Sequence, residues 1–145
     1  MHRVAYLGLL FCVTIVGCYE PQGVEVDFPF GTNALPEVSG SELQSFVARS
    51  EKPVLVEFGV DFNCERCQSV NSEVQDLAEK YKDTVKVVRV DFTANVKLVA
   101  RYGGTICPTY VIFDHGKPVS VQSFPTSAAR LESELVNLVQ QPGTK

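Results

Sequence analysis

Apolar residues follow two different spacings along the chain from about residue 35 onward. Short, largely apolar runs predict β-strands, and apolar residues three and four positions apart predict helices with one buried face. The predicted strands lie at residues 35–38, 54–58, 85–91, 109–113 and 119–124. The predicted helices begin at residue 39, span residues 64–82 and 94–102, and begin again near residue 127. The resulting order, β-α-β-α-β-α-β-β-α, predicts an α/β fold.

The ends and faces of the predicted helices carry their own signals. Ser39 and Glu42 have the spacing of a capping box at the start of the first helix. Residues 114–117, Asp-His-Gly-Lys, predict a hairpin turn between the last two strands. The helix positions expected to be buried are Cys67, Val70, Val74, Leu77, Ala78 and Tyr81 in the 64–82 helix, and Ala128, Leu131, Leu135, Leu138 and Val139 in the last helix.

The first residues have the pattern of an export signal. A short positive start precedes an uncharged apolar run over residues 4–16, which is too short to cross a bilayer of about 30 Å as a helix. The following Ile15-Val16-Gly17-Cys18 is similar to the lipobox of bacterial lipoproteins, in which the cysteine is lipidated and becomes the mature N-terminus. The alternative is a plain signal peptide or short anchor that leaves Cys18 an ordinary thiol.

This N-terminal pattern and the length of 145 residues set the predicted domain organisation. We predict a signal peptide over residues 1–17, a lipid-anchored tether over 18–36 and a single domain over 37–145. A hydrophobic fraction of 45% is enough for that domain to form a core. The net charge is −4 and the positive residues are scattered, so we do not expect nucleic-acid binding.

Two cysteines at the start of the 64–82 helix carry the candidate chemistry. In Cys64-Glu65-Arg66-Cys67, the two thiols lie one helical turn apart and can bond to each other. Free amide groups and the positive end of the helix dipole stabilise a thiolate at the first position. Cys64 is therefore the predicted nucleophile of a thiol–disulfide exchange, and Cys67 is the predicted resolving thiol. A zinc site and an inert disulfide are the alternatives, although the sequence has no second CxxC and no histidine pair.

Three segments of the chain together carry a family resemblance. They are Pro-Val-Leu-Val-Glu-Phe at residues 53–58, the Cys64–Cys67 motif, and Cys107-Pro108-Thr109-Tyr110. With them, residues 53–140 resemble a thioredoxin-family domain, which implies a thioredoxin-like fold with a central mixed β-sheet flanked by helices. Residues 90–95 are also similar to the C-terminal domain of the periplasmic thiol:disulfide interchange reductase.

The resemblance has consequences for the segment that contains Pro108. It implies a cis peptide bond before this proline, beside the two cysteines. A simple strand start is the alternative role for the proline. The backbone before Pro108 would bind a partner chain as an added strand. Cys107, Thr109, Glu65 and Arg66 are accordingly expected to contact the substrate.

Two positions before the first cysteine depart from the family pattern. Asn63 stands where an aromatic residue is usual, and Phe62 lies one step earlier, where it can cover the same surface. Glu57 resembles the buried acid that exchanges a proton with the resolving thiol, and burial would suit it to general-base work near neutral pH. One extra residue separates Glu57 from Cys64, however, so a strand carboxylate facing water is the alternative.

The residues around the two thiols also depart from the pattern. Glu65-Arg66 contains no histidine to hold a thiolate as an ion pair, which favours a reductase or exchange role over a strong oxidant. Cys107 is a third thiol next to the predicted pair, and three interpretations stay open. It can pack as a small hydrophobe, exchange with Cys64, or bind a soft metal ion such as Cu(I) together with the other two thiols.

Taken together, these patterns predict an enzyme, a thiol–disulfide oxidoreductase acting on protein disulfides and thiols outside the cytoplasm. It would work with a redox partner protein and without a cofactor or resident metal. The residues expected to be catalytic are Cys64, Cys67, Pro108 and Glu57. The chain is expected to be a monomer anchored to the membrane through lipidated Cys18, facing the periplasm or the extracellular side. The alternatives are a Cu(I)-binding or metal-delivery protein and a redox-inert interaction module.

Overall fold

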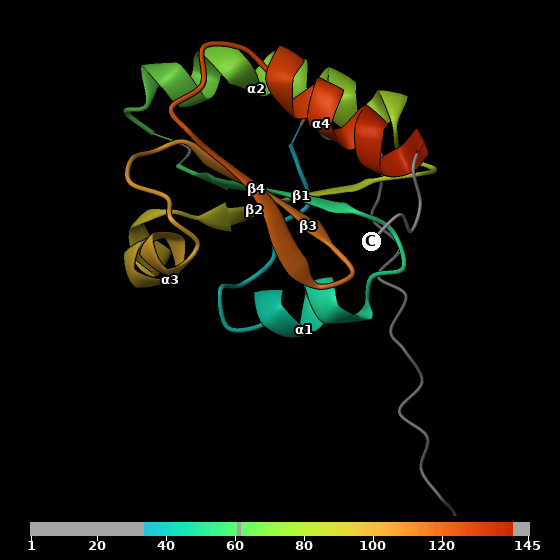
Figure 1. The fold of residues 1–145 in the computed structure, drawn as a ribbon. Coiled ribbons are helices and arrows are strands. Elements are labelled where there is room, and N and C mark those ends of the chain that lie inside the picture. The colour runs from blue at the N-terminus through green and yellow to red at the C-terminus, as the bar shows by residue number, and fades with distance from the viewer. Residues whose placement is uncertain (1–33, 61, 141–145) are drawn as a thin grey trace, which may run out of the picture.

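A four-stranded mixed sheet lies at the centre of the computed structural model, which describes residues 34–60 and 62–140. The strands are β1 (Val54–Gly59), β2 (Lys86–Asp91), β3 (Thr109–Asp114) and β4 (Lys117–Ser123). Their order across the sheet is β2-β1-β3-β4. Strand β1 runs parallel to β2 and antiparallel to β3, and β3 runs antiparallel to β4 (Figure 1). The predicted mixed sheet is thereby confirmed.

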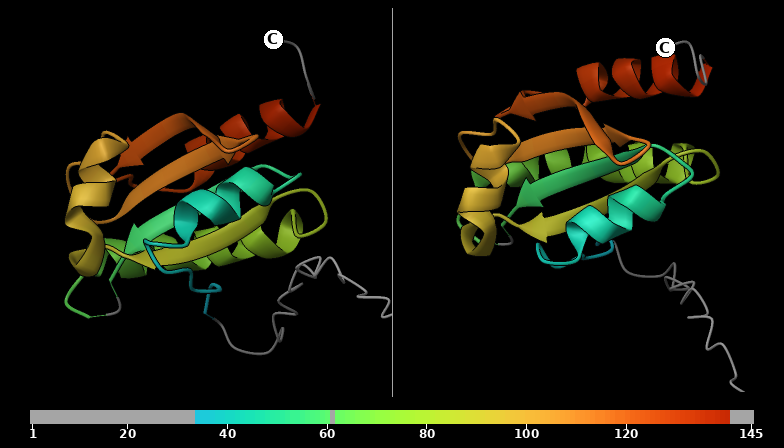
Figure 2. Two further views of the ribbon diagram at one scale, coloured as in Figure 1. Left: turned by 90° about the horizontal axis from the view of Figure 1, so that it is seen from below. Right: turned by 60° about the horizontal axis from the view of Figure 1, so that its bottom comes forward.

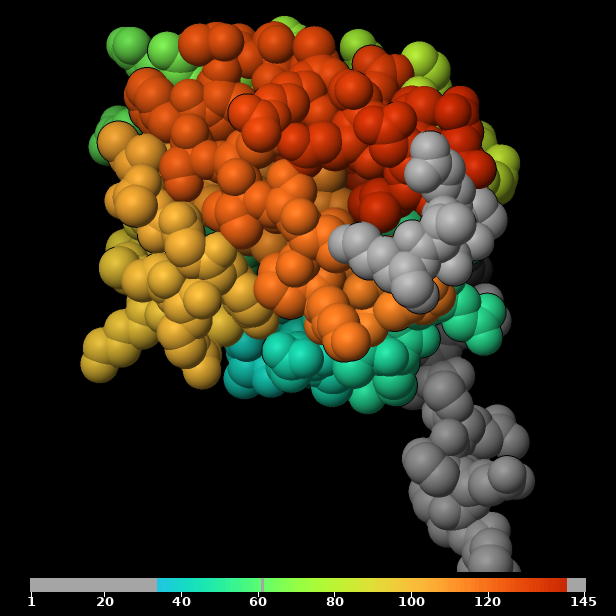
Figure 3. Space-filling view, viewed as in Figure 1, coloured from blue at the N-terminus to red at the C-terminus, as the bar shows by residue number. Residues whose placement is uncertain are grey.

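Helices cover both faces of this sheet. They are α1 (Leu43–Arg49), α2 (Glu65–Lys80), a short 3₁₀ helix η1 (Thr93–Asn95), α3 (Val96–Arg101) and α4 (Ala129–Gln140). Helices α2 and α4 lie on one face, and α1 lies on the other (Figure 1). Helix α3 lies at one end of the sheet, beside the ends of the strands (Figure 2). In the space-filling view, the β3–β4 hairpin and α4 form much of the visible surface (Figure 3).

Strand β1 is central because its residues can be buried on both sides. All six residues from Val54 to Gly59 are buried. Its apolar run matches the sequence of a strand covered on two faces. Leu55 contributes to the core beneath α2 and α4, whereas Val56 and Phe58 contribute to the core on the other side. Since successive side chains of a strand point to opposite faces, β1 joins the two cores.

The predicted helix faces are confirmed. Cys67, Val70, Val74 and Leu77 of α2 are buried. The buried positions of the C-terminal helical segment are Ala128, Leu131 and Leu135. The remaining predicted positions, Ala78, Tyr81, Leu138 and Val139, are partly buried and pack against the same core.

The capping signal at Ser39 also corresponds to an observed contact. The backbone N–H of Glu42 donates to Ser39 Oγ at 3.3 Å, and Ser39 Oγ donates to Glu42 Oε2 at 2.5 Å. The first of these bonds pairs a backbone N–H near the start of the helix, whereas the second joins two side chains. Regular helix nevertheless begins only at Leu43, because residues 40–42 form a turn.

The predicted strand at residues 35–38 is wrong in extent. It is a single parallel bridge between Glu37 and Arg89. Backbone bonds of 2.8 Å join Val38 N to Arg89 O and Arg89 N to Pro36 O. Pro36 has no N–H to donate, so the ladder does not continue in that direction. Leu35 is buried against the core, so packing begins two residues before the predicted domain boundary at 37.

The predicted signal peptide and the lipidation site Cys18 lie outside the described residues, as does most of the tether. They stay predictions. Among the residues that the structure describes, no helix is long and apolar enough to cross a membrane.

Candidate active site

The site is built where α2 begins, directly after the loop that follows β1. Cys64 is the N-cap of α2, and its Sγ accepts a hydrogen bond from the backbone N–H of Cys67 at 3.0 Å. Cys64 and Cys67 form a disulfide. Cys67 is 2% exposed, whereas Cys64 is half-buried. The predicted geometry of the motif is confirmed, since the outer sulfur lies at the helix start and the inner sulfur is shielded behind it.

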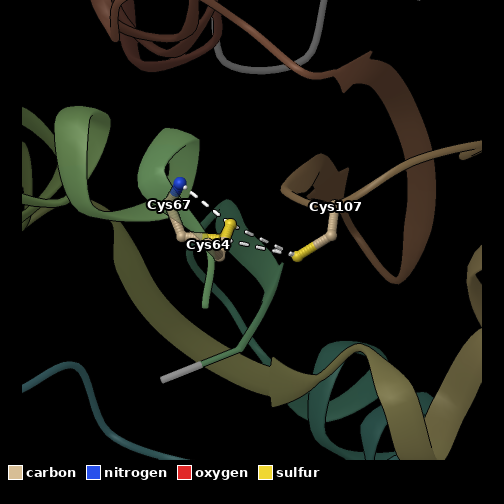
Figure 4. A group of neighbouring side chains, drawn as sticks. All are labelled: Cys64, Cys67 and Cys107. Carbon is tan, nitrogen blue, oxygen red and sulfur yellow. Dashed lines mark hydrogen bonds between the residues drawn. A yellow bond between two sulfur atoms is a disulfide. The ribbon is translucent and has the colours of Figure 1, made fainter. Parts of the chain in front are cut away.

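A cis peptide bond joins Cys107 to Pro108 on the other side of the disulfide, as predicted. Cys107 Sγ lies 3.9 Å from Cys64 Sγ and 3.3 Å from Cys67 Sγ. Figure 4 shows the Cys107 side chain pointing from its loop toward the disulfide at the start of α2. The fold thus brings together three sulfurs that are 43 and 40 residues apart in sequence.

Cys107 is a thiol whose surroundings disfavour ionisation. It is free and half-buried. Burial raises the pKa of the Cys107 thiol, and the negative charge of Glu57 raises it further. Cys107 is therefore protonated near neutral pH and is a poorer nucleophile than an activated thiolate.

Thr109 lies directly after the cis proline and holds the loop in place. Its Oγ1 donates to the carbonyl of Ile106 at 2.6 Å and lies 2.9 Å from Ser123 Oγ on β4. Thr109 is 0% exposed. The Thr109 side chain is thus used within the fold and is not available to a partner in this structure.

Glu57 is buried beneath the site, which overturns the alternative of a carboxylate facing water. It is 0% exposed. Arg89 donates to Glu57 Oε2 from Nε at 3.2 Å and from Nη2 at 3.1 Å. The Tyr110 hydroxyl donates to Oε1 at 3.3 Å. Burial favours the protonated acid and the guanidinium favours the carboxylate, so the two influences on Glu57 oppose each other.

The neighbours of Glu57 are fixed by strand register. Glu57 on β1 is paired with Arg89 on β2 and with Tyr110 on β3. We refer to Arg89, Glu57 and Tyr110 as the polar row. Burial and the Glu57 charge raise the pKa of Tyr110, so its hydroxyl remains a donor well into the alkaline range. A Cβ atom added to Gly59 would lie only 2.9 Å from Glu57 Oε1. Glycine at this position therefore leaves room for the Glu57 carboxylate.

Comparison with known proteins identifies the family. The model of the family described as Thioredoxin matches residues 34–141. The chain belongs to the thioredoxin family. Thioredoxin from Griffithsia pacifica is 34% identical over 86 residues, which cover 59% of this chain and 78% of that protein. The X-ray structure of Fasciola hepatica thioredoxin has a TM-score of 0.61 at 22% identity, covering 71% of this chain and 98% of that one, and it shows the shared fold.

Other relatives are longer than the matched region. Chloroplastic thioredoxin X from Arabidopsis thaliana is 34% identical over 85 residues, or 59% of this chain. The chain spans 46% of the length of that protein, and also 46% of chloroplastic thioredoxin Y from Oryza sativa. The similarity to the periplasmic reductase domain stays a prediction.

This member of the thioredoxin family presents an apolar rim around the disulfide, which we define as Phe62, Ile106 and Phe124. These residues are 83%, 48% and 42% exposed. We expected Phe62 to cover the surface beside the cysteines. Its side chain instead extends into solvent. Asn63 after it has φ 55°, a left-handed conformation that asparagine tolerates better than most residues. This conformation turns the chain between Phe62 and the disulfide.

Glu65 and Arg66, the two charged residues between the cysteines, lie beside the apolar rim. Glu65 is exposed, and the Arg66 guanidinium lies 4.7 Å from the centroid of the Phe124 ring. Phe124 in turn donates from its backbone N–H to the carbonyl of Pro108 at 2.7 Å. A cation–π contact of this kind contributes about 0.5–1 kcal/mol at an exposed site. Arg66 thereby connects the start of α2 to the loop beside the cis proline.

Three residues of this site, Phe124, Ile106 and Arg89, are not predicted from the sequence. The apolar pattern places Phe124 only at the end of a strand, and no local pattern indicates its contact with Arg66 or the exposure of Ile106. Arg89 carried a usable signal, because a charged residue inside a largely apolar strand requires a partner when buried. Glu57 in the neighbouring strand is the matching charge.

Proposed function

We propose that this chain is a thiol–disulfide oxidoreductase that acts on protein disulfides through Cys64 and Cys67. One observation carries the proposal. The Cys64 sulfur caps α2 and accepts the Cys67 N–H at 3.0 Å, at the partly exposed end of the motif. An amide donor and a helix N-terminus both stabilise a thiolate at that position after reduction.

The reaction follows from the positions of the two sulfurs. In the reduced chain, the Cys64 thiolate attacks one sulfur of a substrate disulfide, and the other substrate sulfur leaves as a thiolate. A mixed disulfide between Cys64 and the substrate results. Cys67 loses its proton and attacks Cys64 Sγ, which forms the intramolecular disulfide and releases the second substrate thiolate. The substrate gains two electrons, and a dithiol donor returns the enzyme to its reduced form.

A reductase or exchange role is favoured over strong oxidation. Strong oxidants need a strongly stabilised thiolate in the reduced form. Within the described part of the chain, the sole histidine is His115, in the β3–β4 turn at the opposite end of β3 from Pro108. Arg66 is the nearest cation in sequence, and it contacts the Phe124 ring. The helix start is thus the main source of thiolate stabilisation.

The apolar rim and the cis proline supply a surface for the substrate. Phe62, Ile106 and Phe124 expose apolar area next to the disulfide. An unfolded or loosely folded protein segment that presents a disulfide can pack on this area, in keeping with the role of exposed apolar patches in binding. Glu65 and Arg66 lie beside that surface and would contact such a segment.

Insulin reduction by the full chain, with dithiothreitol as donor, tests this function. We expect Cys64→Ser to abolish the activity and Cys67→Ser to accumulate a mixed disulfide at Cys64. Ser69→Ala is a matched control, because Ser69 is exposed on the same helix and its hydroxyl donates to the Arg66 carbonyl. Undiminished activity in the Cys64→Ser chain would overturn the proposal.

We also propose that the chain works outside the cytoplasm, held to a membrane by a lipid on Cys18. The apolar run at residues 4–16 and the Gly17-Cys18 junction support this location. Expression in a bacterium fed a labelled fatty acid tests it. The label should be lost in Cys18→Ser and retained in Cys12→Ser. Equal labelling of both variants, or none in the parent, would contradict the anchor.

A further inference from the structure

Cys107 is the one sulfur of the described chain that the exchange reaction does not use. Its Sγ belongs with those of Cys64 and Cys67 to a group in which all three atoms lie within 4.8 Å of one another. Cys67 is buried, while Cys64 and Cys107 are half-buried, so the group is partly accessible to solvent. The fold therefore creates a cluster of soft ligands at a single point.

The position of Cys107 does not suit attack on the disulfide. An attacking sulfur approaches along the S–S axis, so it would lie farther from the leaving sulfur by one bond length of about 2 Å. Cys107 Sγ instead lies at comparable distances of 3.3 Å and 3.9 Å from the two sulfurs. It is beside the bond and not beyond either end.

The same distances suit coordination of a metal ion. With metal–sulfur bonds of about 2.3 Å, three sulfurs in a trigonal plane lie about 4 Å apart. Cys107 already lies 3.9 Å from Cys64 and 3.3 Å from Cys67. The Cys64 and Cys67 sulfurs are bonded here, and reduction frees them to separate. Of the three distances between the sulfurs, only the one between Cys64 and Cys67 must increase substantially.

The ligand set selects the ion. Thiolates are soft ligands that favour Cu(I). Structural zinc almost always takes four ligands, and the group found among the described residues has three members. We propose that the reduced chain binds one Cu(I) ion through Cys64, Cys67 and Cys107.

Copper binding and disulfide exchange would exclude each other. A phosphine reduces the disulfide by taking an oxygen atom from water and leaving that water's two protons on the sulfurs. Three S–H protons then leave for solvent as three Cu–S bonds form, and copper remains Cu(I). Among the described residues, the oxidised chain offers only the Cys107 thiol to the ion. Copper should therefore favour the reduced form, because a ligand that binds one state shifts the equilibrium toward it.

The test uses the full chain with Cys12→Ser and Cys18→Ser, which leaves three cysteines, purified in mild detergent and reduced anaerobically with a phosphine. Cu(I) is supplied as its coloured complex with the chelator bicinchoninate. We expect transfer of one Cu(I) per chain, with no transfer to the oxidised chain. Removal of a residue that only hydrogen-bonds to a metal ligand typically weakens metal binding about 10- to 100-fold. Cys107→Ser and Cys107→Ala remove a ligand itself, so each should weaken copper binding by more than that.

X-ray absorption of the copper-loaded parent gives a readout that does not depend on how well the variants fold. We expect three sulfur neighbours around copper. Two sulfurs, unchanged affinity in both folded Cys107 variants, or copper uptake by the oxidised chain would each overturn the copper site. Insulin reduction without copper, measured on the same preparation, separates the two proposals. A preparation active in reduction but unable to take copper refutes this inference alone, whereas one that takes copper without reducing insulin refutes the exchange function.

Discussion

The two faces of the central sheet are built from different kinds of residue. Toward α1 and α3, the buried side chains in the described strands are uncharged: Thr109 is polar, and the others are apolar, namely Val54, Val56, Phe58, Val88, Val90, Val111 and Phe113. Toward α2 and α4, the polar row of Arg89, Glu57 and Tyr110 crosses three neighbouring strands among apolar residues. Both faces of the sheet are covered by helices, but only the face toward α2 and α4 contains charged side chains.

This difference separates the part of the core that supports the fold from the part that influences the chemistry. Apolar packing is satisfied by any side chain of suitable volume. A buried carboxylate, in contrast, requires specific partners in a specific register. The charge of Glu57 also reaches the site, where it raises the pKa of Cys107. We therefore expect substitutions on the two faces to differ in their pH dependence as well as in their size.

Arg89→Met should have the largest effect, because it leaves Glu57 charged and buried without its cation. We expect a loss of about 3–5 kcal/mol in the free energy of unfolding at neutral pH, measured by urea denaturation. With the guanidinium gone, burial raises the pKa of Glu57 in the folded variant, so the loss should shrink as the pH falls from that raised pKa toward the unfolded value of about 4. Arg101→Met is a control for loss of an exposed arginine, with an expected change within about 0.5 kcal/mol. A small, pH-independent loss at Arg89 would contradict the importance of the pair.

The ion pair also illustrates what the sequence could and could not predict. Short apolar runs in the sequence predicted β1 to β3, and apolar residues spaced three and four positions apart predicted α2 and α4. Both patterns are visible because burial of one or two faces imposes them on the sequence. The start of α2 at the cysteines and the cis proline were likewise predicted. Pairing of Glu57 with Arg89 depends on the parallel register of β1 and β2, which no local pattern contains. The exposure of Phe62 depends on the left-handed turn at Asn63, which is a property of the loop conformation.

Tyr110→Phe should have an intermediate effect, since Glu57 loses a hydrogen bond but keeps Arg89. We expect a loss of about 1–3 kcal/mol in the free energy of unfolding near pH 7. The raised pKa of Tyr110 in the folded chain adds stability that is present below the unfolded value of about 10 and is lost as the pH rises above it. The parent should thus lose stability more steeply above pH 10 than the variant, as followed by urea denaturation across that range.

Tyr102→Phe serves as the matched control for that substitution. Its hydroxyl makes an exposed contact of 3.4 Å with Gln44 Oε1 and lies outside the polar row. We expect a change within about 0.5 kcal/mol. Equal losses at the two tyrosines would show that the polar row is not a distinct element of the core.

Phe113→Leu should have the smallest effect, because it exchanges one apolar side chain for another on the uncharged face. Phe113 is 1% exposed and makes an edge contact with Tyr102 at 5.1 Å between ring centroids. We expect a loss of about 1 kcal/mol, equal at pH 5 and pH 8, with insulin reduction unchanged where the chain is folded. A pH-dependent loss here would remove the contrast between the faces.

The reduction potential of the Cys64–Cys67 pair tests the central claim most directly. The full chain would be equilibrated with glutathione buffers of graded composition, and free thiols would be trapped and assigned by mass. We predict a potential between about −270 and −180 mV, the range of exchange-active pairs from thioredoxin to protein disulfide isomerase. A potential below about −300 mV, typical of structural disulfides, would contradict the account.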